Sequence, residues 1–255
     1  MLDEDPLDDR LAPHEWKLRL VAIPAAFAIA LAFHAWPTGH WLQRTFLTMI
    51  PHELGHAVTA WFCGYTAVPS VWKTLVPEAR GVIAPVLVGA LNAYLLVRAW
   101  NTQGKTIAAI AIALVLAQLV GTFVIEPRTA SMAITFGGDA GAMVIGTLLV
   151  LAFFAPAGSK LRQGGLRWGL LAIGAATLVD TFATWWTARH DVDAIPFGEI
   201  EGVGLSDPSK LEQLHGWTPH QMIDRYTTLG LACLLVIAVV WAWGTSRARR
   251  DVGGA

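Results

Sequence analysis

Long apolar segments separated by short polar connections recur along most of the chain. A bilayer core of ~30 Å takes about 20 helical residues, and indole rings prefer the membrane interface, so tryptophans at this separation mark the ends of spans. Three apolar segments are bracketed in this way, by Trp16 and Trp36, Trp41 and Trp61, and Trp168 and Trp186. Further apolar segments lie at about 81–100, 105–126, 139–156 and 227–243. The pattern predicts an all-α, polytopic membrane helix bundle with about six to seven transmembrane segments.

The composition supports a membrane protein. Of the 255 residues, 55% are hydrophobic and only 15% are charged, and the mean hydropathy is +0.50, more apolar than a water-soluble domain of this length needs to be. The net charge of -1 gives no indication of a nucleic-acid partner. The two cysteines, Cys63 and Cys233, form no CxxC pair and stand in apolar surroundings, so we expect both to be buried packing residues.

The chain is expected to form one integral-membrane domain over residues 1–255. It begins with an acidic tail (1–15) that lacks the basic start of a secretory signal, so we expect the first apolar segment to be retained. By the positive-inside rule, Arg247, Arg249 and Arg250 place the C-terminus in the cytoplasm, which predicts a multi-pass protein of the cell membrane. Basic residues near the start of the first span also favour the cytoplasm for the N-terminus. Two cytoplasmic termini require an even number of crossings, whereas the apolar pattern gives about seven candidates. The sequence therefore does not decide the side of the N-terminus.

One sizeable polar loop interrupts the apolar pattern, at about residues 189–226. Within it, Asp207-Pro208 followed by SKLEQL predicts a short capped helix. Thr218, Pro219 and Gln221 have the spacing of a capping box that opens the last helix. The loop is interpreted as an ordered connection between helices, and the alternative is a lid or substrate-docking element.

Residues 49–64, MIPHELGHAVTAWFCG, place three ionisable side chains within an apolar segment. On a helix His52 and His56 point from the same face, close enough for both imidazoles to bind one metal ion. Glu53 projects from an adjacent direction, where its carboxylate can accept the proton of a water molecule that attacks a carbonyl. Zinc fits best, because imidazole and carboxylate ligands beside an open position are typical of its catalytic sites.

Two structural alternatives compete with a metal site at this segment, a polar cluster that packs helices together and a haem-type bis-histidine site. An ionisable group near the middle of a span costs ~2–3 kcal/mol, so three of them together favour a functional site.

The sequence HELGHAVTAWFCG in an early transmembrane segment resembles the zinc-binding helix of the site-2 protease family, the intramembrane zinc metalloproteases. The resemblance covers about residues 46–64, with a looser similarity at GVIAPVLVGALNAYL (81–95). It implies a core of transmembrane helices, zinc held by His52, His56 and an aspartate from a later helix, and cleavage of peptide bonds in membrane-protein substrates. The family's second motif, an Asn-x-x-Pro run leading into Asp-Gly, has its nearest counterpart in GGDAG (137–141).

The third zinc ligand is expected to be Asp139. Two histidines fill half of a tetrahedral shell, and a catalytic site normally takes one more protein ligand. Because Asp139 follows a flexible Gly137-Gly138 pair and precedes an apolar run, the competing explanation is a helix N-cap. Asp180 is the next candidate, with hydrogen bonds to nearby threonines as its competing explanation. The expected site therefore comprises His52, His56 and Asp139 as metal ligands and Glu53 as the catalytic base.

Three functions are consistent with these residues. The first is an intramembrane zinc metalloprotease, a zinc-dependent metalloendopeptidase that acts on membrane-protein substrates within the lipid bilayer. The second is a catalytically inactive, site-2-protease-like binding or regulatory protein. The third is a membrane transporter with an intramembrane His/Asp metal site. The presence of Glu53 favours the first over the second, because a purely structural site has no need of that carboxylate. His34 and His40 are interpreted as interfacial residues beside Trp36 and Trp41.

Overall fold

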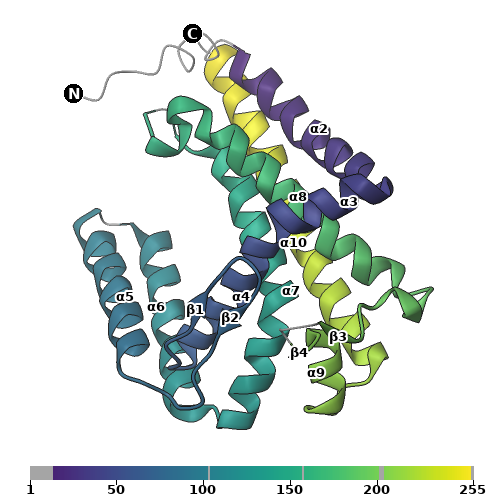
Figure 1. Ribbon diagram of the computed structural model, residues 1–255. Coiled ribbons are helices and arrows are strands. Elements are labelled where there is room, and N and C mark those ends of the chain that lie inside the picture. The colour runs from purple at the N-terminus through teal and green to yellow at the C-terminus, as the bar shows by residue number, and fades with distance from the viewer. Residues whose placement is uncertain (1–13, 103, 157, 201–203, 254–255) are drawn as a thin grey trace. The chain divides into compact units, whose positions relative to one another are not determined.

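The computed structural model describes residues 14–102, 104–156, 158–200 and 204–253 (Figure 1). Most of the acidic tail predicted at 1–15 therefore lies outside the described residues. Where the chain is described, its strands are limited to short two-residue pairs, and the remaining regular structure is helical. This confirms the all-α class.

The chain divides into two compact units. Unit 1 comprises residues 1–51, 142–196 and 217–255, and unit 2 comprises residues 52–141 and 197–216. Each unit contains helices that are long and apolar enough to cross a membrane. The prediction of a single membrane domain therefore stays a prediction.

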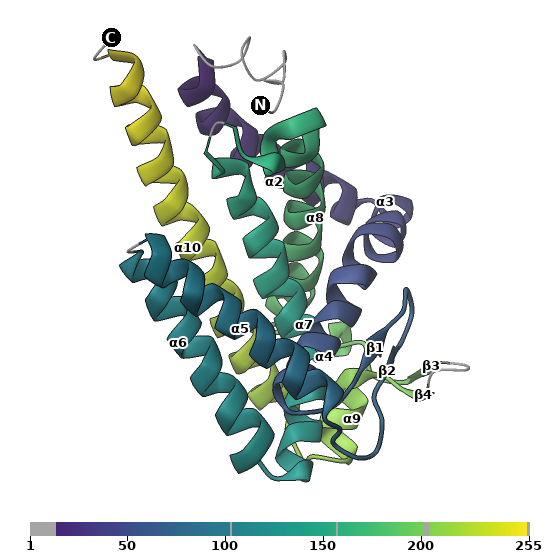
Figure 2. The same cartoon turned by 90° about the vertical axis from the view of Figure 1, so that its left-hand side faces the viewer.

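Six helices within the described residues have the length and hydropathy of a membrane span, in agreement with the expected six to seven. They are Glu15–Ala35, Ile83–Thr102, Lys105–Val124, Pro127–Phe154, Leu166–Thr187 and Pro219–Arg250 (Figure 2). The segment expected to span between Trp41 and Trp61 is not among them. It is one continuous helical run made of α3 (Pro37–Gln43), the π-helical turn η2 (Arg44–Thr48) and α4 (Met49–Phe62).

Pro51 explains the π-helical turn within this run. Proline has no backbone N–H, so the carbonyl of Leu47, four residues earlier, loses its helical partner. The Thr177 hydroxyl donates to this carbonyl at 3.0 Å, while the backbone N–H of Met49 reaches back to Arg44, five residues earlier, as in a π-helix. A buried hydroxyl from α8 thus satisfies the acceptor that Pro51 frees.

Unit 1 is built around α2 (Glu15–Ala35), α8 (Leu166–Thr187) and α10 (Pro219–Gly253), which pack against one another. Ala30 of α2 packs against Ala175 and Val179 of α8, and the Trp241 indole of α10 donates to the carbonyl of Arg19 at 2.9 Å. Three short 3₁₀ turns complete the unit, namely η4 (Ala152–Phe154), η5 (Lys160–Gly165) and η6 (Val192–Ala194).

A buried ion cluster fixes the start of α2. The Glu15 carboxylate accepts hydrogen bonds from Arg19 at 2.8 Å, from Arg162 at 3.2 Å and from Arg167 at 3.1 Å. Glu15 and Arg167 are almost fully buried, and a buried carboxylate is stable only when such partners replace its hydration. The contacts join α2 to η5 and α8.

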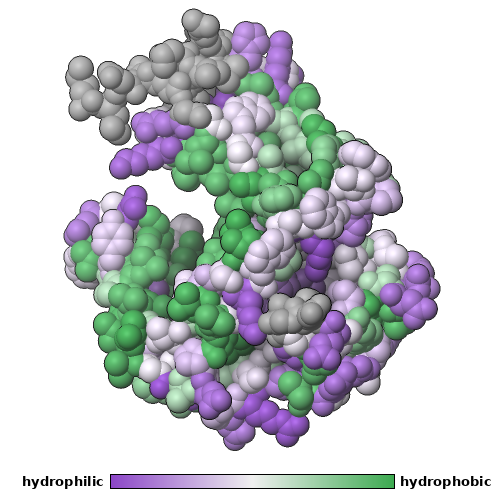
Figure 3. Space-filling view, viewed as in Figure 1, coloured by the Kyte–Doolittle hydropathy of each residue, from purple (hydrophilic) through white to green (hydrophobic). Residues whose placement is uncertain are grey.

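In unit 2, α5 (Ile83–Thr102) and α6 (Lys105–Leu119) form a helical hairpin that continues into the π-helical turn η3 (Val120–Val124). The buried Gln118 side chain links the two helices, accepting from Asn92 at 2.9 Å and donating to the carbonyl of Pro85 at 2.7 Å. The outer faces are apolar, as Figure 3 shows over both helices. The exposed side chains include Val86, Leu87, Leu91, Val97, Ile110, Ile112 and Leu116. Such a surface suits a lipid environment.

Helix α7 (Pro127–Leu151) begins earlier than the sequence indicated, which was about residue 139. Gly137 and Gly138 are helical and are not a flexible entry to the helix. Instead, glycines allow the backbones of α4 and α7 to meet. A Cβ atom added to Gly55 would lie 2.3 Å from the Gly137 carbonyl oxygen, and one added to Gly141 would lie 2.3 Å from the Gly55 Cα atom.

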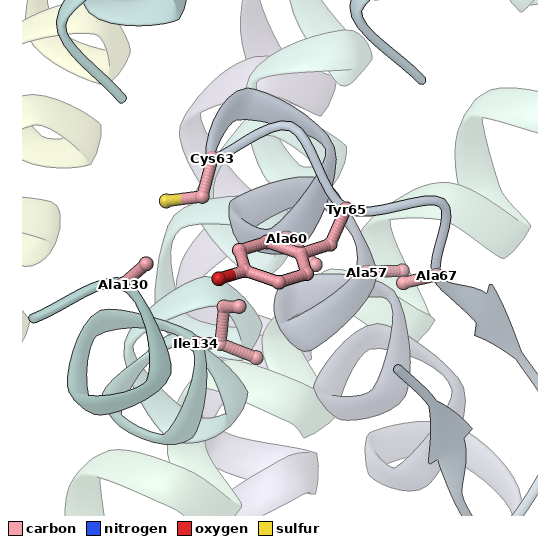
Figure 4. Close-up of a cluster of buried hydrophobic side chains, with 7 residues drawn as sticks. All are labelled: Ala57, Ala60, Cys63, Tyr65, Ala67, Ala130 and Ile134. Carbon is pink, nitrogen blue, oxygen red and sulfur yellow. The ribbon is translucent and has the colours of Figure 1, made fainter. Parts of the chain in front are cut away.

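A small apolar cluster continues this contact between α4 and α7. It contains Ala57, Ala60, Cys63, Tyr65, Ala67, Ala130 and Ile134 (Figure 4). Both cysteines are free and buried, as predicted. Burial raises the pKa of the Cys63 thiol, although the nearby Arg80 guanidinium lowers it, so Cys63 serves as an apolar packing residue.

The polar loop is ordered over its described residues. In unit 2 it contains the strand pair β3 (Glu199–Ile200) and β4 (Gly204–Leu205), followed by α9 (Asp207–Gln213). The predicted short helix is thereby confirmed, but its N-cap is Ser206, whose hydroxyl accepts from the Ser209 N–H. In unit 1 the capping box that opens α10 is also confirmed. The Thr218 hydroxyl accepts from the Gln221 N–H at 3.2 Å, and the Gln221 side chain accepts from the Thr218 N–H at 3.0 Å.

Gly55→Ala is expected to lower the apparent melting temperature of the detergent-solubilised protein. The added methyl group would push apart two backbones, and overpacking of this kind costs ~1–3 kcal/mol. Gly89→Ala is the matched control, because a Cβ atom there meets only the Gln118 side chain, at 3.6 Å, and alanine favours a helix over glycine by ~1 kcal/mol. Equal melting temperatures for the two variants would show that the close contact is not needed.

Candidate metal centre

Hydrogen bonds at Nδ1 hold the two histidines of α4 so that their Nε2 atoms face each other. The Nδ1 atom of His56 lies 2.6 Å from the carbonyl oxygen of Ile134, and that of His52 lies 2.9 Å from Asp139 Oδ1. A carbonyl or carboxylate oxygen only accepts, so both Nδ1 atoms are donors. Hydrogen bonds of this kind orient metal-binding histidines and fix their tautomer. The Nε2 atoms are left as the inward-facing positions.

The two Nε2 atoms converge with a third potential ligand, the carboxylate of Asp207. They are 3.2 Å apart, and Asp207 Oδ2 lies 3.1 Å from that of His52 and 2.8 Å from that of His56. The imidazole rings lie 4.8 Å apart and nearly perpendicular. His52, His56 and Asp207 thus form a group that could hold a metal ion, and all three side chains are largely buried.

Asp207 is the first residue of α9, directly after the N-cap Ser206. Its second oxygen, Oδ1, pairs with Lys210 Nζ at 3.2 Å, which leaves Oδ2 for the histidines. Burial raises the pKa of the Asp207 carboxyl, but the hydrogen bonds and positive charge of His52 and His56 outweigh it and hold the pKa well below its usual range. Asp207 is therefore ionised, the form in which a carboxylate binds a metal ion.

The structure gives Asp139, the ligand expected from sequence, a different place. Asp139 lies within α7 and is not an N-cap, because the helix begins at Pro127. Its carboxylate contacts His52 at Nδ1, on the side of the ring opposite the convergent nitrogen. His52, His56 and Asp207 are thus the groups that converge, and the assignment of Asp139 as a metal ligand stays a prediction.

Gly138 makes room for the two imidazoles. A Cβ atom at this position would lie 2.5 Å from His56 Nε2 and 2.6 Å from His52 Cε1, closer than any side chain can approach. Together with the Gly55 contact, this places the His-bearing face of α4 directly on the α7 backbone. The glycines that the sequence offered as a flexible pair are thus part of the wall of the site.

Glu53, the expected catalytic base, is buried next to His52 in sequence. The hydroxyl of Thr74 lies 2.7 Å from Glu53 Oε2 and 2.7 Å from the Glu53 carbonyl oxygen. Thr74 belongs to β2 (Thr74–Leu75), which pairs with β1 (Val68–Pro69) in a short antiparallel ladder. A hydroxyl from this ladder thus fixes the carboxylate through Oε2.

The sequence missed Asp207 because nothing local marks it. Its DPS context is that of a helix start, and it lies 155 positions after His52. The other expected candidate, Asp180, belongs to unit 1, where it contacts His34, His40 and Arg44.

Comparisons with models of protein families, with characterised proteins and with solved structures give no match for this chain. The resemblance at the HELGH helix therefore rests on that helix alone.

Proposed function

We propose that the protein is an intramembrane zinc metalloprotease in which His52, His56 and Asp207 hold the metal ion. One observation carries this proposal. Both histidines use Nδ1–H toward Asp139 and Ile134, so the two Nε2 atoms and Asp207 Oδ2 converge, with separations of 2.8–3.2 Å. Positive charge balances the carboxylate here, either as protons on the imidazoles or as a metal ion that displaces those protons, and a donor set of two imidazoles and one carboxylate is typical of catalytic zinc sites.

The residues around this centre suit peptide hydrolysis. A zinc ion bound there supplies Lewis acidity, which polarises a peptide carbonyl and makes water a better nucleophile at neutral pH. Glu53 accepts the proton of the attacking water and then delivers it to the leaving amine. Thr74 positions Glu53 through its hydroxyl, and Asp139 holds His52 in the tautomer that presents Nε2.

The substrate class follows from the surroundings of the site. Within unit 2, α5 and the run formed by α6 and η3 are both long and apolar enough to cross a membrane, and both expose large apolar side chains. A substrate that reaches this unit within a bilayer is itself a membrane protein, so we propose transmembrane or membrane-proximal peptide bonds as the targets. The intact Glu53 favours this activity over a structural zinc site.

His52→Ala combined with His56→Ala is expected to remove the metal ion from this centre, since one carboxylate alone does not retain zinc. The measurement is zinc per chain by elemental analysis after purification without chelators. His220→Ala is the matched control, because this histidine is exposed. The same amount of zinc per chain in the parent and in the double variant would rule out this centre.

Glu53→Gln is expected to leave zinc bound while peptide cleavage falls by at least ~10²–10⁴-fold, the usual contribution of a general base. The amide keeps the shape of the side chain but cannot accept the proton. Cleavage of a membrane-protein substrate in proteoliposomes is the measurement, and Glu78→Gln, at an exposed position, is the control. Cleavage at the parental rate by Glu53→Gln would contradict the assigned role.

Asp207→Asn and Asp139→Asn distinguish a ligand from a residue that orients one. Loss of an orienting partner typically costs ~10–100-fold in metal affinity, and we expect this range for Asp139→Asn and a larger loss for Asp207→Asn. Zinc titration against a competing chelator measures both. A greater loss for Asp139→Asn would return the third ligand to the position expected from sequence.

A further inference from the structure

Unit 1 contains a second group of side chains with metal-ligand chemistry, separate from the centre in unit 2. It comprises His34 in the last turn of α2, His40 in α3 and Asp180 in α8. One ligand atom from each residue lies within 4.8 Å of the others. Asp180 is fully buried, at 0% exposure, within a helix that is apolar enough to cross a membrane. An ionisable residue in such a position points to a function.

The atoms of this group approach one another without forming hydrogen bonds. Asp180 Oδ1 lies 2.8 Å from His40 Nε2 and 3.5 Å from His34 Nδ1. Yet all three atoms are buried and have no hydrogen-bond partner among the described residues. Buried polar atoms are rarely left without a partner. Ligand atoms that point toward a common ion position lie close together but are not aligned for hydrogen bonds with one another. The three atoms of this group have this arrangement.

Arg44 orients the carboxylate. Its Nη1 atom donates to Asp180 Oδ2 at 3.2 Å, so Oδ1 is the oxygen left for the histidines. Carboxylates that bind metals are commonly hydrogen-bonded through their second oxygen in this way. The arginine also cancels the charge of Asp180, which lowers the attraction of the group for a cation.

We infer that His34, His40 and Asp180 bind a second divalent transition-metal ion, with zinc as the fitting representative. Imidazole and carboxylate donors select this class over the oxygen-preferring magnesium and calcium ions. Because Arg44 offsets the single carboxylate charge, the affinity is lower than at His52 and His56, where Lys210 offsets one of the three acidic residues Asp139, Asp207 and Glu53. The bound ion joins α2, α3 and α8 within unit 1.

The test uses the full chain and zinc itself, with both sites separable by substitution. The parent is expected to bind two zinc ions, and either double variant, His52→Ala/His56→Ala or His34→Ala/His40→Ala, is expected to bind one. The variant with all four substitutions is expected to bind none. Calorimetric titration should show the weaker of the two binding steps disappearing with His34→Ala/His40→Ala.

Thermal unfolding gives a readout that is independent of activity. In the His52→Ala/His56→Ala background, zinc at about 100 times the dissociation constant should raise the apparent melting temperature by about 5–10 °C. Adding His40→Gln, which retains a polar side chain if the double alanine variant fails to fold, should abolish the rise, and adding His220→Ala should not.

Two outcomes would overturn the inference. One is a His52→Ala/His56→Ala variant that folds but neither binds zinc nor is stabilised by it, which would make the group a metal-free His–Asp–Arg cluster. The other is stabilisation that survives His40→Gln. A single zinc that is lost only with His34→Ala/His40→Ala would support the inference and refute the centre in unit 2, so the two proposals fail separately.

Discussion

The backbone contact between α4 and α7 is the constraint on which the candidate centre depends. Gly55 lies so close to Gly137 and Gly141 that no side chain fits between the helices. Only at this separation can His56 reach the Ile134 carbonyl and His52 reach Asp139. The hydrogen bonds that fix both tautomers are therefore a consequence of helix packing, and the chemistry of the site is set by residues that have no functional group.

The part of the site that is local in sequence could be predicted, because helical geometry fixes it. His52 and His56 share a face at a spacing of four residues, and the capping box at Thr218 follows the same logic of short spacings. The position of Glu53 beside the histidines follows from the same helix. The contact between Glu53 and Thr74 could not be predicted, because the β1–β2 pair that brings Thr74 to Glu53 has no strong sequence pattern.

The parts that depend on long-range packing could not be predicted. Asp139 was expected near the histidines and lies near them, but on the opposite side of the His52 ring, since sequence gives proximity at best and not direction. The Gly137-Gly138 pair reads as a flexible linker in isolation, whereas close packing against α4 makes it helical. His34 and His40 read as interfacial residues beside tryptophans, and only the fold shows that both meet Asp180. Tertiary contacts decide each of these cases.

The position of Asp207 on α9 has a consequence for exchange of a bound ion. Its two histidine partners lie on α4, which is wedged against α7, whereas α9 is a seven-residue helix outside the six candidate spans. Short helices outside the long packed spans generally open locally at a lower free-energy cost than those spans do. An ion held by all three groups would therefore enter or leave through displacement of Asp207, while α4, which carries both histidines, remains in place. In the proposed centre, Asp207 would then set the rate at which the ion exchanges.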